Sequence, residues 1–221
     1  MRHTDGPSKT PLRSVAVKNS YNGSLNPYAF HRKPYTLEEV LNSALIADPL
    51  QPIMTSSIAD GAAAAILCAR DVAKCYEMKR PISIAGCALM SGRFRESDPL
   101  DNDAESIITL TAREAYRQAG MEPKDIDVAE VHDAMSPIEP ISIEDLGFCA
   151  KGEAIRYLQE GRTGITGEIP INTSGCLCSR DQPVGALPAS PRWREIVWQL
   201  RGEAGCECEG RYVRRFRLYS R

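Results

Sequence analysis

The sequence predicts an α/β fold in which strands and helices alternate in layers. Apolar runs at 62–68 and 82–89 have the length and density of strands that are buried on both faces. From 101 to 120 the apolar residues recur instead at helical spacing. A strand pattern returns at 126–131 and leads directly into another helical segment at 137–146. Such alternation is typical of a layered α/β protein.

Size and composition fit a soluble globular protein. The chain has 221 residues, of which 43% are hydrophobic and 25% charged, so it can bury a real core. A net charge of −2 gives no reason to expect nucleic acid as a partner. The longest apolar run, 61–69, is far shorter than the ~20 residues of a membrane-spanning helix, and residues 1–9 lack the apolar core of a signal peptide. We expect a cytoplasmic protein with reduced cysteines and no membrane span.

The first third of the chain combines loops with short helices. Residues 1–35 are polar and rich in turn formers, so we expect loop with one short helix around 13–19. Thr36 is placed to cap a helix at 37–42, and Glu39 stands where a capping box needs its acidic partner. Another short helix is predicted at 70–78, after the first apolar run.

The later segments are marked by caps and helix terminators. Asp101 or Asp103 is expected to cap the helix that Gly120 closes. A further short helix is predicted at 153–160, followed by a short strand at 169–171.

The most informative stretch joins the strand at 126–131 to the helix that follows it. His132 and Asp133 stand at the end of the strand, and Ser136 is a candidate N-cap with Pro137 at the first helical position. Open α/β folds place their chemistry where a strand runs through a turn into a helix. His132 is therefore a candidate catalytic residue, and the alternative is an exposed or purely structural histidine.

A second stretch, 172–186, follows the last predicted strand and is rich in small, turn-forming residues. Such a loop lets a ligand approach the backbone closely. Cys176 and Cys178 lie in it, and Cys206 and Cys208 follow near the end of the chain. Structural zinc pairs usually have two to four residues between the cysteines, so the single-residue spacing does not favour a metal site.

Taken together, these segments resemble the thiolase superfamily, and within it the sterol-carrier-type and archaeal acetyl-CoA acetyltransferase branch. The resemblance runs in collinear order from about 15 to 185. Several motifs carry it: Asn26-Pro27-Tyr28, Asp60-Gly61-Ala62-Ala63-Ala64, Val131-His132-Asp133-Ala134-Met135, Glu144-Asp145-Leu146-Gly147-Phe148-Cys149, Glu160-Gly161-Arg162-Thr163, and the 172–186 loop, which is similar to the family's Asn-Pro-Ser-Gly-Gly…Gly-His-Pro-Val-Gly-Ala.

The resemblance implies an incomplete thiolase-like layered α/β fold, mainly its C-terminal half. Residues 1–46 would be a loop-domain remnant, and 47–98 the end of the N-terminal half. Residues 99–221 would form the C-terminal half, with a divergent tail from about 187 that contains five arginines among its last eleven residues. A solvated tail is the simpler interpretation of these charges, and contact with phosphate groups is the alternative.

The resemblance also implies acyl-CoA acyltransfer, in which a carbon–carbon bond forms or breaks between acyl-CoA thioesters. Coenzyme A thioester is then a substrate, and no permanently bound cofactor is expected. In the family a cysteine thiolate takes up the acyl group and oxyanion holes stabilise the developing negative charge. His132 falls on the position that holds an oxyanion-hole water. Family members form homo- or hetero-oligomers.

Three departures from the family pattern concern catalysis. The family's nucleophilic cysteine belongs to the N-terminal half, and none of the eight cysteines matches its position. Gln182 stands where the Gly-His-Pro histidine is expected, and an amide donates a hydrogen bond but cannot accept a proton near neutral pH. Cys208-Glu209-Gly210 matches the Cys-x-Gly motif, but its apolar and glycine-rich surroundings are absent.

We therefore expect a truncated thiolase-family protein that is inactive alone. Matching and foreign segments alternate abruptly, which suggests a disrupted reading frame. One alternative is a half-enzyme that a partner chain completes with its nucleophile. The other is a non-catalytic CoA-binding or assembly subunit.

Overall fold

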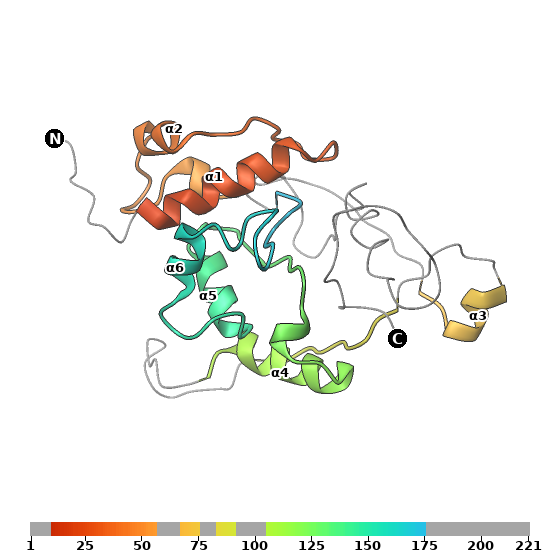
Figure 1. The fold of residues 1–221 in the computed structure, drawn as a ribbon. Helices are drawn as coiled ribbons and strands as arrows, with labels where there is room; N and C mark the ends of the chain where they lie inside the picture. Colours follow the sequence, from red (N-terminus) through yellow and green to blue (C-terminus); the bar gives the residue numbers. More distant parts are fainter. Residues whose placement is uncertain (1–9, 57–66, 76–82, 92–104, 176–221) are drawn as a thin grey trace.

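A computed structural model describes residues 10–56, 67–75, 83–91 and 105–175 of the chain (Figure 1). The six helices of this part are α1 (Thr10–Ser24), α2 (Leu37–Asn42), α3 (Arg70–Cys75), α4 (Ile107–Ala119), α5 (Ile138–Asp145) and α6 (Ala154–Gln159), and the 3₁₀ turns are η1 (Pro52–Met54) and η2 (Pro123–Asp125). None of the helices in the described ranges is long and apolar enough to cross a membrane.

Helix α1 is much longer than the helix predicted at 13–19. It buries Val15 and Ala16, but also Asn19 and Asn22. Because much of the buried face is polar, apolar periodicity in the sequence could not reveal its full length. Helix α1 packs against α2 and α6, and Figure 1 shows it lying across the upper side of α6.

Helix α2 confirms the predicted capping box. The Glu39 backbone N–H donates to Thr36 Oγ1 over 3.1 Å, and the Thr36 N–H donates to Glu39 Oε2 over 2.8 Å. Helix α2 therefore begins at Leu37, as the local sequence signal indicates.

Helix α4 corrects one prediction and confirms another. Its N-cap is Ser106, whose hydroxyl accepts from the Thr109 N–H over 3.1 Å, so the caps predicted at Asp101 or Asp103 are wrong. Ser106 also donates to Asp145 at the end of α5 over 2.6 Å, which ties the start of α4 to the polar end of that helix. Gly120 closes α4 in the left-handed conformation with φ 66°, as predicted.

The predicted strands are represented in the described ranges by isolated bridges. Ala129 pairs in parallel with Ile171, which joins the segments predicted as strands at 126–131 and 169–171. The segment 83–89 makes no strand pairing within the described residues, and 62–66 lies outside them. The layered α/β arrangement itself stays a prediction.

The described residues pack around two apolar clusters. The larger one joins the 126–131 segment, α5, α6 and the 169–171 segment through Ile126, Val131, Ile143, Ala154, Ile169 and Ile171. The smaller one joins α1, α2 and η1 through Ala16, Val40 and Met54. The first cluster fixes the scaffold beneath His132.

Candidate functional site

The segment that carries His132 is held by backbone pairing with the segment before Asn172. The Ala129 N–H donates to Pro170 O over 3.1 Å, and the Asn172 N–H donates to Ala129 O over 2.9 Å. Val128 and Val131 are buried, whereas the His132 side chain is exposed. The segment therefore presents an imidazole at the surface from a backbone that is anchored on both sides.

The turn between His132 and α5 differs from the predicted cap. Helix α5 has Pro137 as its N-cap, with no side-chain capping bond, so the assignment of Ser136 as N-cap is wrong. Ser136 is buried and its N–H donates to Met54 O over 2.9 Å, because the turn packs against η1. The bridge between Thr55 and Met135 belongs to the same contact.

Asn172 connects the His132 segment to α5. Its side-chain Oδ1 accepts from the Val131 N–H over 2.8 Å, and its Nδ2 donates to Glu139 Oε2 over 2.9 Å. The Asn172 backbone has φ 54°, a left-handed conformation that asparagine tolerates better than most other residues. This conformation allows both its backbone and its side chain to bind neighbouring segments.

Glu139 is the buried acid of the site. Its side chain is fully buried and forms an ion pair with Lys18 from α1, with 3.0 Å between Lys18 Nζ and Glu139 Oε1. Lys18 Nζ also donates to Ile171 O over 2.7 Å. The amine therefore compensates the buried carboxylate and binds the strand-like segment beneath the 172–175 loop.

Asn19 completes this polar cluster. Its Nδ2 donates to Asp133 Oδ2 over 2.8 Å and to Glu139 Oε2 over 3.0 Å. Asp133 and Asn19 are both completely buried. We refer to Lys18, Asn19, Asp133, Glu139 and Asn172 as the polar cluster.

Four further hydrogen bonds fix the loop that begins at Asn172. Asn26 donates to Ser174 O over 2.9 Å, and Asn22 donates to Asn172 O over 3.0 Å. The Glu130 carboxylate accepts from the Ser174 N–H over 2.9 Å and from the Ser174 hydroxyl over 2.7 Å. The loop is therefore bound from α1 on one side and from the residue before Val131 on the other.

Among the three predicted site residues, the structure describes His132 alone, since Gln182 and Cys208 lie outside the described ranges. Sequence reasoning missed Lys18, Asn19, Glu139 and Asn172 as members of one cluster. A signal was available for Glu139, because it stands between apolar residues in α5, where an acid is unexpected. No group of three or more potential metal-ligating side chains occurs in the parts of the chain that the structure describes.

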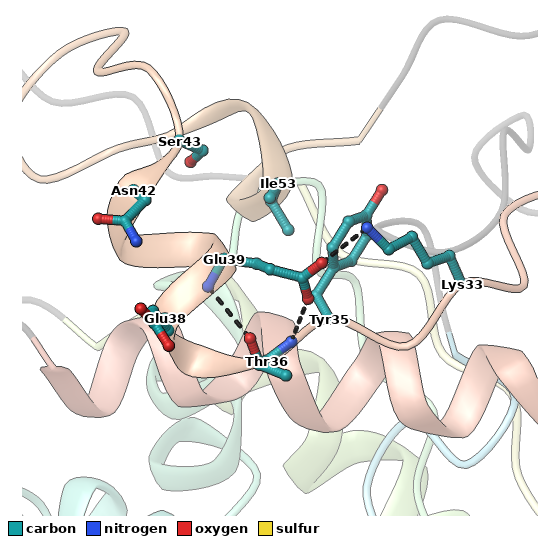
Figure 2. Close-up of a pocket in the computed structure, with 8 residues that line it drawn as sticks. All are labelled: Lys33, Tyr35, Thr36, Glu38, Glu39, Asn42, Ser43 and Ile53. Carbon is teal, nitrogen blue, oxygen red and sulfur yellow. Dashed lines mark hydrogen bonds and ion pairs between the residues drawn. The ribbon is translucent and has the colours of Figure 1, made fainter.

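A surface hollow of about 460 Å³ lies beside α2, away from His132 in the sequence (Figure 2). Lys33 Nζ contacts Glu39 Oε1 at 2.7 Å and stands 4.9 Å from the centre of the Tyr35 ring. The hydrogen bond between Lys33 and Glu39 raises the pKa of the lysine and lowers the pKa of the glutamate. Lys33 and Glu39 thus compensate each other's charge, and Glu38 is a second acid in the lining of the hollow.

Comparison with known proteins places this chain in a family. A family model described as "Thiolase C-terminal domain-like" matches residues 100–213, which is more than half of the chain. The solved structure of the Ltp2-ChsH2(DUF35) aldolase includes a chain that aligns with a TM-score of 0.66 at 26% identity, covering 81% of this chain and 48% of that one. The fold class is therefore thiolase-like.

The curated relatives agree with this thiolase-like assignment. The acetyl-CoA acetyltransferase of Methanothermobacter thermautotrophicus is 42% identical over 90% of this chain and 52% of its own length. The benzoylsuccinyl-CoA thiolase subunit BbsB of Thauera aromatica is 34% identical over 84% of this chain and 48% of its own length. Sterol carrier protein 2 of Gallus gallus is 34% identical over 86% of this chain and 36% of its own length.

This chain belongs to the thiolase family, and its relatives include archaeal acetyl-CoA acetyltransferases and sterol carrier protein 2. The chain spans about half or less of the length of these curated relatives.

Proposed function

We propose that this chain provides the C-terminal part of an acyl-CoA acyltransferase site that forms or cleaves a carbon–carbon bond between acyl-CoA thioesters. The observation that carries the proposal is the exposed His132 between two residues that the polar cluster anchors. The similarity to acetyl-CoA acetyltransferases supports the same substrate class. Acyl-CoA would enter as a substrate, and we infer no permanently bound cofactor.

In this proposal His132 is a hydrogen-bond donor of an oxyanion hole. An imidazole N–H can donate, directly or through a water molecule, to an oxygen that gains negative charge during the reaction, without carrying a full charge itself. Gln182 would be a second donor, and Cys208 is a candidate for the family's second cysteine. We retain the division into 1–46, 47–98 and 99–221 as a proposal for the domain organisation.

We further propose that the chain is inactive without additional groups. A glutamine at position 182 cannot accept a proton from a thiol, so a base for the nucleophile would have to come from elsewhere.

A thiolysis assay tests the activity directly. Purified protein is incubated with acetoacetyl-CoA and CoA, and loss of the thioester enolate absorbance is followed. We expect no turnover above that of the His132→Ala variant for the chain alone. Turnover well above this control would support the acyltransferase chemistry and contradict inactivity.

A second candidate function is a subunit that a partner chain completes. Two similar proteins are described as parts of assemblies, namely a thiolase subunit and the Ltp2-ChsH2(DUF35) aldolase. Large apolar side chains are also exposed in the described ranges, with Phe30 73%, Ile46 61% and Tyr28 60% exposed. Binding of CoA by calorimetry without turnover, followed by turnover once a co-encoded thiolase-like chain is added, would favour this function.

A non-catalytic CoA-binding or assembly subunit would bind CoA and show no turnover with any co-encoded thiolase-like chain. Sedimentation velocity then separates a homo-oligomer from a hetero-oligomer, because only the hetero-oligomer changes its mass when the partner chain is added.

A further inference from the structure

We propose that Glu139 is a positioning residue that fixes His132 through the polar cluster, an inference that rests on the proposed role of His132. Glu139 lies seven positions after His132 in the sequence and makes no direct contact with it among the described hydrogen bonds. It acts instead on the residues before and after the histidine.

Glu139 Oε2 accepts hydrogen bonds from three side chains, two on α1 and one in the loop that begins at Asn172. It accepts from Asn19 Nδ2 over 3.0 Å, from Asn172 Nδ2 over 2.9 Å and from Lys18 Nζ over 3.3 Å. The two lone pairs of Oε2 suffice for the two amide groups, and the Lys18 ammonium lies nearer to Oε1, at 3.0 Å. The single oxygen therefore orients two amide groups at the same time.

Each of these two amide groups holds one neighbour of His132. With its Nδ2 bound to Glu139, Asn172 directs Oδ1 to the Val131 N–H. With its Nδ2 shared between Glu139 and Asp133, Asn19 fixes the Asp133 carboxylate. His132 is thus clamped at the preceding and the following residue by contacts that meet at Glu139.

The composition of the cluster indicates a geometric role more than a general gain in stability. A buried ion pair is often no more stabilising than apolar side chains of the same volume, because both charges must leave water. A fixed set of donors and acceptors, in contrast, specifies one arrangement of the segments that carry them. The cluster therefore determines where the exposed imidazole stands.

The substitution Glu139→Gln tests this role in the full chain. The new amide has one oxygen, so its NH₂ group faces either the Lys18 ammonium or the NH₂ groups of Asn19 and Asn172, and a donor opposes a donor in both orientations. We expect the Val131 amide proton, which donates to Asn172, to exchange at least about tenfold faster in NMR measurements. The Leu110 amide of α4 donates to Ser106 O and serves as the internal reference.

Val40→Ala is the matched control. It removes buried methyl groups from α2, and Val40 makes none of the cluster's side-chain hydrogen bonds. At an equal fall in Tm, Val40→Ala should change Val131 and Leu110 exchange by the same factor. If Glu139→Gln also changed the exchange rates of the Val131 and Leu110 amides by the same factor, the proposal would be overturned, because the substitution would then act through global destabilisation.

If Glu139→Gln does not fold, Asn19→Ala provides a second test of how the polar cluster fixes His132. This variant removes the bond to Asp133 but leaves the contacts of Asn172 with Glu139 and Val131. We expect the imidazole resonances of His132 to shift while Val131 protection is kept. Unchanged His132 resonances would overturn the proposal.

Turnover measurements separate this inference from the proposed function. In an assembly that is active, Glu139→Gln should lower kcat about tenfold or more with KM within about twofold of wild type, because substrate binding groups are unchanged. Local NMR changes without acyl transfer in any assembly with a partner chain would support the positioning role and contradict the proposed function. Acyl transfer with an unchanged kcat in Glu139→Gln would overturn the positioning role alone.

Discussion

The thiol of Cys149 is held in its neutral form by its surroundings. Burial raises the pKa of Cys149 to about 11, and the carboxylates of Glu144 and Glu153 act in the same direction. Alkylation requires the thiolate, so at pH 8 we expect iodoacetamide to modify Cys149 more than about tenfold more slowly than the exposed Cys87. The Cys149 rate should keep rising with pH up to about 11. Peptide mass spectrometry measures both rates, and equal rates at pH 8 would contradict the assignment.

Gly167 occupies a position with no room for a side chain. A Cβ there would lie 2.2 Å from the Arg162 carbonyl oxygen, which is backbone and cannot turn away. We expect Gly167→Ala to lower the free energy of unfolding by about 1–3 kcal/mol in urea titrations. Gly164→Ala is the control, because its Cβ would lie 3.2 Å from Gly161 O and needs a smaller adjustment. A loss no greater than that of the control would show that the turn can relax.

The residues of the site differ in how far the sequence reveals them. His132 could be singled out because a strand-to-helix turn is a position favoured for chemistry. Glu139 carries only a weak signal, as an acid between apolar residues, and Lys18 carries none, since a charged residue in sequence is normally on the surface. Their ion pair spans 121 positions. Pairings at this distance follow from tertiary packing and leave no local pattern.

At the scale of elements, local sequence signals predicted the helix ends that are set by interactions within one helical turn. The start of α2 follows from its capping box, and the end of α4 follows from Gly120, because both act within one helical turn. The full length of α1 was not predictable, since its buried polar face is satisfied by α5 and the 171–174 segment. The start of α4 depends in the same way on Ser106, which also binds Asp145.

The capping box of α2 gives a quantitative prediction. Thr36→Ala removes the acceptor for the Glu39 N–H, and we expect a loss of about 1 kcal/mol in the free energy of unfolding. Glu39→Gln keeps the box, because a glutamine amide oxygen can still accept from the Thr36 N–H. It removes only the exposed ion pair with Lys33, which solvent screens, so it should cost clearly less than Thr36→Ala. Chemical denaturation of both variants checks the order, and a larger loss for Glu39→Gln would contradict it.

At the scale of the whole molecule, the family membership was predictable whereas the layered arrangement remains a prediction. Motifs in collinear order survive large changes of sequence, and the thiolase C-terminal match at 100–213 agrees with them. Helix α1 lies outside that match, yet its side chains bind the backbone and acids of segments within it. Helix α1 and the described segments around Asp133 and Asn172 therefore form one hydrogen-bonded unit.

Asn22→Asp tests the connection between α1 and the 172–175 loop. Asn22 is buried and donates to Asn172 O across 150 positions, so a carboxylate there would face a carbonyl oxygen without a donor. We expect a loss of about 3 kcal/mol in the free energy of unfolding at pH 7. Burial raises the pKa of the introduced carboxyl, and its protonated form can donate, so the loss should shrink as the pH falls towards 4. Asn42→Asp, on the exposed end of α2, is the control and should change the stability by less than about 0.5 kcal/mol at either pH. An Asn22→Asp variant as stable at pH 7 as this control would mean that α1 is not joined to the 172–175 loop through Asn22.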